Sequence, residues 1–321
     1  MKPWAAGSRS AARCVVLGRP DMPAYRRSLR PYIALAHHAP AAKRHSETSS
    51  EEGGGYDARL QVAALTRGTR LFWASLVFHL KGLAQSSFFL VIGVITPVVL
   101  ATIAFYLFQS GGQSESLLYA ALGAGLMGIW STTLFGSGGA IQWQRWQGTL
   151  ELLIAAPVPF IVVLVPLTLA TAAYGLVSLV STLVWGRVLF GIHLDLVHPV
   201  LFVIAVPSAV IGLGLLGLLL ASTFVLYRNA NALSNLLGEP IWLITGMLVP
   251  ISLLPGWVTP LSWVLAPTWG IRAIRESALG GNPLPAILMC LGLGAAYTLI
   301  AAVCLRHFER LARTRATLAL T

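Results

Sequence analysis

Long stretches without a charged residue alternate with short polar segments along most of this chain. Six stretches contain no Lys, Arg, Asp or Glu: 82–114, 116–144, 152–186, 196–227, 240–271 and 277–305. A helix needs about 20 apolar residues to cross a bilayer, and each stretch is long enough for one crossing. The pattern predicts helices near 86–108, 117–138, 160–185, 199–226, 236–254 and 284–305. Because backbone groups in hydrocarbon must hydrogen-bond internally, we expect an all-α, polytopic membrane protein with six transmembrane helices.

Composition supports a membrane protein and argues against a nucleic-acid partner. Hydrophobic residues make up 56% of the chain and charged residues 10%, with a mean hydropathy of +0.75. Soluble domains carry about 25% charged residues. The net charge of +11 is spread over the N-terminal arm, short loops and the tail rather than gathered in one patch. The three cysteines have no C-x-x-C or Cys/His spacing, so neither a disulfide nor a metal site is expected.

The basic residues predict the orientation of the spans. One side of the predicted membrane holds ten Lys/Arg, namely Arg59, Arg67, Arg70, Lys81, Arg145, Arg228, Arg306, Arg310, Arg313 and Arg315. The other side holds Arg187, Arg272 and Arg275. Since Lys and Arg collect on the cytoplasmic side, both termini and the 139–158 loop are expected in the cytoplasm.

Three regions follow from these patterns. Residues 1–57 carry nine Lys/Arg and a polar cluster, SETSSEEGGG, and are expected to be a disordered basic arm. Translation from Met22 is an alternative that would shorten this arm. Residues 58–305 form the predicted six-helix permease domain, and 306–321 form a basic cytoplasmic tail.

The segment 58–84 mixes basic and aromatic residues just before the first predicted span. Its candidate interfacial residues are Arg67, Arg70 and Lys81, with Phe72, Trp73 and Phe78 between them. Such a helix can lie in the membrane interface with its basic side toward anionic headgroups, which makes membrane lipids a partner. A plain cytoplasmic helix leading into the first span is the alternative.

Several kinds of chemistry are missing from the sequence. The uncharged stretches contain no carboxylate, so coupling to protons or sodium ions has little to act through. No G-x-x-x-x-G-K-[ST] loop and no G-x-S-x-G elbow occurs. We therefore expect no enzyme, no catalytic residue and no cofactor or metal bound by this chain. A secondary transporter or channel of six spans not coupled to ATP is one alternative, and a membrane scaffold is another.

The loop at 139–158 is expected to be an amphipathic elbow. Gly136, Gly138 and Gly139 are expected to end the second helix, and the segment AIQWQRWQ can form a short helix under the membrane. Gly148 permits a change of direction, Thr149 can cap the next helix, and Glu151 favours that helix's first turn. The elbow can dock a partner, or Glu151 can serve only as a cap.

The outer segment 251–282 alternates tryptophans with prolines, which break spanning helices. Short half-helices anchored by tryptophan in the outer interface are expected here. The residues assigned to a possible outer gate are Pro250, Trp257, Trp263 and Trp269. An aromatic belt without a gating role is the alternative.

Two motifs resemble the type-2 ABC transporter permease family. The first is RWQGTLELLIAAPV, which shares Arg145, Gly148, Thr149, Leu150, Glu151, Leu152, Pro157 and Val158 with the family's loop between spans two and three. It departs at Gln144, where an acid is usual, and at Trp146 and Gln147. The acid that an ion pair at position 144 would need is therefore missing.

The second motif is 239–275, which is similar to the family's fifth span and the proline-rich segment after it. Its matching positions are Pro240, Thr245, Gly246, Pro250, Pro255, Trp257, Pro267, Thr268 and Arg275. The tail RHFERLARTRATLAL resembles the family's basic tail, so the resemblance covers about 59–321.

The resemblance implies the membrane subunit of an ABC exporter in a bacterial inner membrane. Two permease copies, identical or related, would pair, and each would dock on a separate ABC ATPase subunit that binds ATP and Mg. The residues implied in coupling to this ATPase are Arg145, Gly148, Thr149 and Glu151. The uncharged spans suggest a hydrophobic or amphipathic cargo, as in multidrug efflux.

Overall fold

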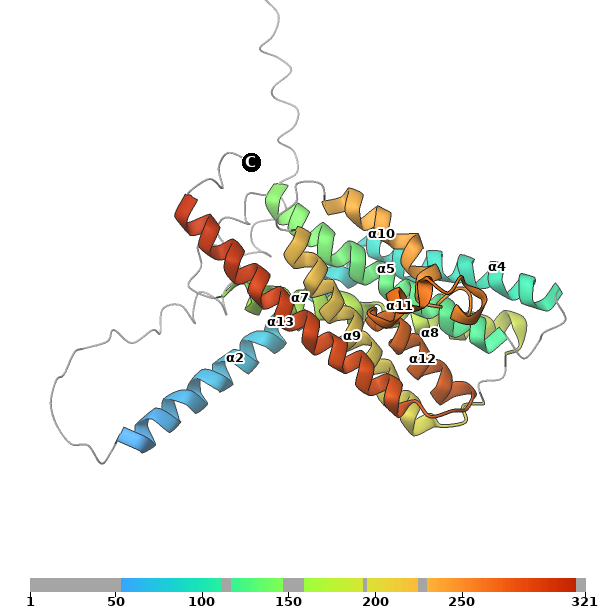
Figure 1. The fold of residues 1–321 in the computed structure, drawn as a ribbon, viewed down its shortest axis with the longest axis horizontal. Coiled ribbons are helices and arrows are strands. Elements are labelled where there is room, and N and C mark those ends of the chain that lie inside the picture. Colours follow the sequence, from blue (N-terminus) through green and yellow to red (C-terminus); the bar gives the residue numbers. More distant parts are fainter. Residues whose placement is uncertain (1–52, 111–116, 147–158, 193–194, 225–229, 316–321) are drawn as a thin grey trace, which may run out of the picture. The chain divides into compact units, whose positions relative to one another are not determined.

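The computed structural model describes residues 53–110, 117–146, 159–192, 195–224 and 230–315. The chain divides into two compact units, Met1–Leu60 and Gln61–Thr321, and of the first unit only the beginning of α2 is described. Every regular element in the described residues is a helix (Figure 1). The elements are α2 (Gly53–Ala84), α3 (Ser87–Leu90), the π-helix η2 (Val91–Ile95), α4 (Thr96–Ser110), α5 (Leu117–Trp146), α7 (Phe160–Tyr174), α8 (Leu176–Phe190), α9 (Pro199–Phe224), α10 (Ala230–Ile244), the 3₁₀-helix η4 (Ile251–Leu253), α11 (Val258–Trp263), α12 (Ala266–Leu279) and α13 (Leu284–Arg315).

Five helical segments of the described residues are long and apolar enough to cross a membrane. They are Ser87–Tyr106, Leu117–Gly139, Phe160–Phe190, Pro199–Phe224 and Leu284–His307. These segments confirm five of the helices predicted from the uncharged stretches. The chain is therefore a multi-pass membrane protein by the length and hydropathy of its helices.

The predicted helix 236–254 is wrong at its C-terminal end, because α10 stops at Ile244. With 15 residues α10 is about 22 Å long, shorter than the hydrocarbon core of about 30 Å. A turn at Gly246, the short helix η4, and helices α11 and α12 follow instead of a continuous span. The described residues thus confirm short helices within 251–282, whereas their position in an outer interface stays a prediction and the six-span count is unconfirmed.

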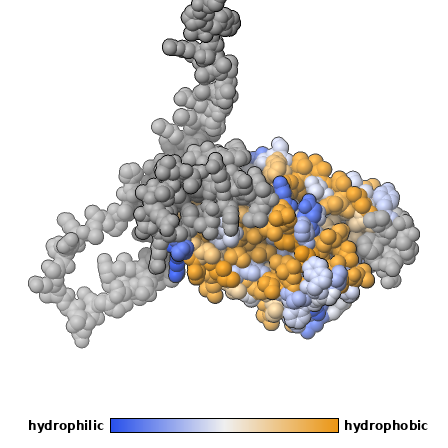
Figure 2. Space-filling model, turned by 45° about the horizontal axis from the view of Figure 1, so that its top comes forward, coloured by the Kyte–Doolittle hydropathy of each residue, from blue (hydrophilic) through white to orange (hydrophobic). Residues whose placement is uncertain are grey.

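Helix α5 forms the centre of the helical body. The apolar part of α5 is 89% buried, against 22% for the first span and 28% for the last. It packs against α4, α7, α8, α9 and α10, and Trp130 is fully buried within this core. The first and last spans are the least covered, so many of their apolar side chains are exposed to lipid or to a partner. Where Figure 2 colours the surface, apolar residues cover much of it, with hydrophilic residues between them.

Glycines on α5 allow neighbouring helices to approach closely. A Cβ added at Gly128 would lie 2.3 Å from Cβ of Ser178, and one at Gly136 would lie 2.3 Å from Cγ2 of Thr171. Small residues at such positions are the usual means of tight helix packing in membranes. The expectation that Gly136, Gly138 and Gly139 end the second helix is wrong, because α5 continues through them to Trp146.

The first span contains a π-helical turn for which Pro97 offers a reason. In a regular α-helix the N–H of residue 97 would bond to the carbonyl of Gly93, but proline has no N–H. The hydroxyl of Ser178 on α8 donates to that carbonyl at 2.6 Å. The π-helix η2 therefore lies where the backbone ladder is interrupted, and a side chain from another span satisfies the free carbonyl.

Candidate functional site

The residues predicted to couple to an ATPase fall mostly outside the described residues. Arg145 lies in the last turn of α5, which ends at Trp146. Gly148, Thr149 and Glu151 belong to 147–158, which the structure does not describe. The docking role of this loop therefore stays a prediction.

The predicted interfacial segment 58–84 forms a single helix, α2, which contains Arg67, Arg70 and Lys81. Arg70 and Lys81 are exposed and lie three turns apart on the same face. Trp73 and Phe78 are also exposed, with 61% and 52% of their surface accessible. A helix in water would leave these aromatic side chains solvated, which favours the interfacial position, and this position stays a prediction.

The clearest site in the described residues surrounds the turn after α10. Gly246 adopts a φ of +79°, a left-handed conformation that side chains with a Cβ rarely take. The turn leaves the carbonyls of Gly246 and Met247 outside the helix, where they need other donors. Thr245 and Gly246 were singled out by the resemblance of 239–275. Gly246 makes the turn that ends α10, and the hydroxyl of Thr245 donates to the carbonyl of Ile241 at 2.6 Å.

Arg275 on α12 supplies those donors. Its Nη1 donates to the carbonyl of Gly246 at 2.6 Å, and its Nη2 donates to the carbonyls of Met247 at 2.8 Å and Tyr119 at 3.4 Å. The guanidinium carbon lies 3.3 Å from the centre of the Tyr119 ring. We call this set of contacts the Arg275 clamp. It joins α12, the end of α10 and the start of α5.

The guanidinium of the clamp is buried but stays a cation at neutral pH. Only 8% of Arg275 is exposed. Burial lowers its pKa to about 10, while the contact with Tyr119 acts in the opposite direction. A buried cation is stable only when its hydrogen bonds are largely made, and here backbone carbonyls and an aromatic face make them.

Helix α5 leaves room for the clamp at Gly123. A Cβ at this position would lie 2.3 Å from the carbonyl oxygen of Met247 and 2.8 Å from Nη2 of Arg275. Because the first of these atoms belongs to the backbone, it has no simple way to move aside. Gly123 is therefore required by the close approach of α5 to the turn after α10.

A pocket of about 360 Å³ lies beside the clamp. Its lining residues come from α5, from the turn and η4, and from α11 and α12: Tyr119, Thr245, Gly246, Pro250, Ile251, Ser262, Trp263, Thr268, Trp269, Ile271, Arg272, Arg275 and Glu276. Ligand pockets in proteins span about 300–1,000 Å³ and combine aromatic walls with a few polar groups. The pocket meets both conditions.

Three of the four residues assigned to an outer gate line the pocket, and the fourth lies outside it. Trp269 is buried, its indole N–H donates to the carbonyl of Trp263 at 2.9 Å, and the two rings meet edge to face at 5.5 Å. Pro250, Trp263 and Trp269 line the pocket, whereas Trp257 does not and is 70% exposed. The structure thus brings three of the four together, and their gating role stays a prediction.

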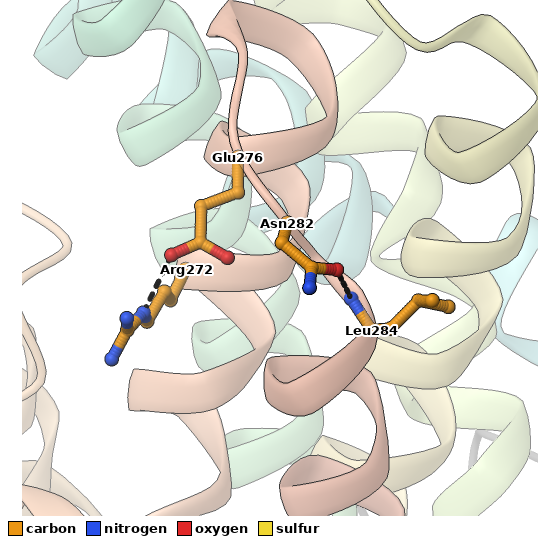
Figure 3. Close-up of polar contacts among 4 residues, drawn as sticks. All are labelled: Arg272, Glu276, Asn282 and Leu284. Atoms are coloured by element: carbon orange, nitrogen blue, oxygen red, sulfur yellow. Dashed lines mark hydrogen bonds and ion pairs between the residues drawn. The ribbon is translucent and has the colours of Figure 1, made fainter.

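One ion pair lies at the rim of the pocket. Nε of Arg272 lies 2.7 Å from Oε1 of Glu276, one helical turn further along α12 (Figure 3). Figure 3 also shows the Asn282 side chain accepting a bond from the backbone N–H of Leu284, at the beginning of α13. The guanidinium of Arg272 also lies 5.7 Å from the ring of Trp269.

Helix α13 holds the junction between α11 and α12. The hydroxyl of Tyr297 accepts a hydrogen bond from the N–H of Ala266 at 3.1 Å and donates to the carbonyl of Val264. Cys290, also on α13, lies 3.7 Å from the carbonyl of Ala266. The last span thereby positions the first turn of α12, on which Thr268 and Trp269 lie.

Sequence reasoning missed the partners of Arg275. It counted Arg275 as a charge of an outer loop and as a family match, and it gave Tyr119 and Gly123 no role. The signal that could have identified the site is the position of Arg275, since an arginine so close to an apolar run of 32 residues needs buried acceptors. Which carbonyls serve as acceptors depends on tertiary packing and is not visible in a sequence.

Comparison with known proteins agrees with the helices and with both motifs. The model of the family described as "ABC-2 type transporter" matches residues 70–279, which include the first four spans, the Arg275 clamp and the pocket. No curated protein matches the chain at significant similarity.

Proposed function

We propose that this chain, which belongs to the ABC-2 type transporter family, is the permease subunit of an ATP-driven exporter that moves a hydrophobic or amphipathic substrate out of the cell. The observation that carries the proposal is the family match across 70–279 on a body of apolar helices. That the chain is a transporter membrane component follows from the family. The export direction, the ATPase partner and the substrate class are our inference.

The energy for transport would come from a separate subunit. The sequence contains three lysines, Lys2, Lys43 and Lys81, and none follows the glycine-rich loop of a P-loop ATPase. We therefore assign ATP and Mg to a partner ATPase. The loop with Arg145, Gly148, Thr149 and Glu151 would receive it, as the resemblance implies.

Helix α5 connects this loop with the Arg275 clamp. With 30 residues it is about 45 Å long, with Arg145 in its last turn and Tyr119 near its beginning. A movement imposed at residue 145 would reach the pocket by rigid displacement of α5, since the clamp ties its first turns to α12. ATP binding by the partner would bias an equilibrium between two arrangements of this lever.

The outer segment would then serve as the gate. Pro250, Trp263 and Trp269 border the pocket, so a displacement of α5 that is passed on through the clamp would reach them. A second permease copy would complete the path, and the site of action would be the inner membrane of a bacterium. The exposed apolar faces of α4 and α13 are available for lipid or for that copy.

The experiment is reconstitution with and without an ATPase. The chain would be purified with the ATPase that co-purifies with it and placed in vesicles loaded with a fluorescent apolar dye. We expect dye movement only with the ATPase, ATP and Mg present together. Full-rate movement without nucleotide would indicate a channel or secondary transporter, and the proposal would then be wrong.

A further inference from the structure

The pocket beside the Arg275 clamp carries one positive charge in excess. Its charged lining residues are Arg272, Arg275 and Glu276. Glu276 is paired with Arg272 at 2.7 Å, whereas the acceptors of Arg275 are neutral carbonyls. No carboxylate of the described residues pairs with Arg275. A buried cation without a counter-ion favours an anion nearby, because Coulomb attraction is strong where water is largely excluded.

Two buried polar atoms of the lining also lack a partner. Nε of Arg275 and the hydroxyl of Thr268 make no hydrogen bond within the part of the chain that the structure describes. Both residues are more than nine-tenths buried, with 8% and 5% of their surface exposed. Buried polar groups normally have a partner, so these two lining groups retain the capacity to donate hydrogen bonds to a ligand that carries oxygens.

The surroundings of the pocket suit an amphiphile rather than a free ion. Trp263 and Trp269 form an aromatic wall beside the polar groups. Leu261 and Val264, close to Trp263 in the sequence, are exposed, and so is Leu253 on η4, with 47%, 60% and 75% of their surface accessible. The apolar chain of a ligand bound in the pocket would contact this surface, and its burial there would stabilise binding through the hydrophobic effect.

We propose that this pocket binds an acidic amphiphile, whose carboxylate or phosphate neutralises the excess charge and whose apolar part lies on Trp263 and the exposed leucines. The acidic group can belong to either of two kinds of molecule. One is the headgroup of an anionic membrane lipid, and the other is a free acidic amphiphile such as a fatty acid. No step of ATP coupling is needed for either to bind.

Native mass spectrometry of the purified full-length chain in detergent tests the proposal. Four probes would be titrated: phosphatidylglycerol, phosphatidylcholine, oleate and oleyl alcohol. We expect saturable one-to-one binding of phosphatidylglycerol, of oleate or of both, and the stronger of the two identifies the source. Phosphatidylcholine and oleyl alcohol should bind at least about tenfold more weakly. Equal binding of the charged and uncharged probes would overturn the proposal.

Two charge variants at the rim give opposite expectations. Arg272→Gln lowers the pocket charge and should weaken binding of the acidic probe by about three- to tenfold, whereas Glu276→Gln raises the charge and should strengthen it similarly. Arg187→Gln is the matched control, because it removes one exposed arginine outside the pocket. Affinities that shift equally in all three variants, or not at all, would contradict the site.

A further variant tests the buried hydroxyl. Thr268→Val keeps the shape of the side chain but removes the orphan group, so binding of the acidic probe should weaken while the helical content measured by circular dichroism is unchanged. Unaltered binding in Thr268→Val together with unaltered binding in Arg272→Gln would sink the proposal. Because no ATPase is present in these measurements, their outcome is independent of the function proposed above.

Discussion

Arg275 and Gly246 are 29 residues apart in the chain and are joined by a hydrogen bond of 2.6 Å between Nη1 and the backbone carbonyl. The bond closes a loop that begins where α10 stops and ends inside α12. The N–H groups of Gly246 and Met247 already bond to carbonyls of α10, and Arg275 provides donors for the carbonyls of these two residues. The same guanidinium donates to the carbonyl of Met247 in that turn and to the carbonyl of Tyr119 on α5, so it joins α12, the turn and α5.

Replacing Arg275 should destabilise the protein strongly. Arg275→Met leaves the carbonyls of Gly246 and Met247 unpaired in a buried place, and each lost charge-assisted bond costs about 1.5–3 kcal/mol. Arg275→Lys should recover only part of the loss, because a single ammonium cannot reproduce the planar fork that joins three carbonyls. Thermal unfolding in detergent would measure both. Arg272→Lys, at an exposed position, is the control, and an equal shift in Arg272→Lys would contradict the clamp.

Gly123 offers a test of the close approach that makes the clamp possible. Gly123→Ala places a Cβ 2.3 Å from a backbone oxygen, so α5 must move away from the turn, at a cost of about 1–3 kcal/mol. Gly292→Ala in α13 meets nothing within 4 Å and should be neutral or slightly stabilising. Each of the two variants adds one Cβ to a glycine within a helix. A midpoint of thermal unfolding that falls equally in both would show that packing at 123 is not special.

The long spans were predictable because hydropathy reports burial in lipid directly. The runs 116–144 and 196–227 became α5 and α9 with nearly the expected N-terminal ends. The run 240–271 was misleading at its C-terminal end, since absence of charge cannot distinguish a continuous helix from a turn with short helices. The left-handed Gly246 and the prolines after it decide that question.

The candidate site was only partly predictable, because some of its contacts join residues that lie far apart in the sequence. Pro250, Trp263 and Trp269 were identified from composition, and Arg275 from family resemblance. Tyr119 lies 156 residues away from Arg275 in the sequence, and its contact arises only when α5 and α12 pack together. Such a pair has no local signature in the sequence, and it is the contact that joins the clamp to α5.

Removing one hydroxyl from α13 should weaken the outer segment. Tyr297→Phe leaves the N–H of the fully buried Ala266 without the partner it has at 3.1 Å, which costs about 1–3 kcal/mol. The unfolding midpoint should therefore fall. Tyr106→Phe is a matched control, because Tyr106 is 63% exposed and its ring contact with Phe190 needs no hydroxyl. Equal midpoints for the two variants would show that the tyrosine of α13 does not hold α12.

The coupling loop is best tested by separating docking from transport. Glu151→Arg reverses the charge in the expected first turn of a helix, and Gly148→Pro removes the expected freedom to change direction. Both variants should insert and carry an intact clamp, because residues 117–146 and 266–279 are untouched. We expect ATP-driven dye export in vesicles to fall at least about tenfold in each, while binding of the acidic probe by the purified chain stays at the wild-type level.

The contrast with the clamp makes this last prediction specific. Arg275→Lys acts at the other end of α5 and should lower thermal stability, whereas Glu151→Arg should leave thermal stability unchanged and uncouple transport. If α5 transmits force between the loop and the clamp, ATP hydrolysis by the complex carrying Glu151→Arg should show one of two results. It should continue without export, or it should no longer depend on the permease. Normal export in both loop variants would mean that force does not pass through residues 148–151, and the lever would then have to begin elsewhere in the chain.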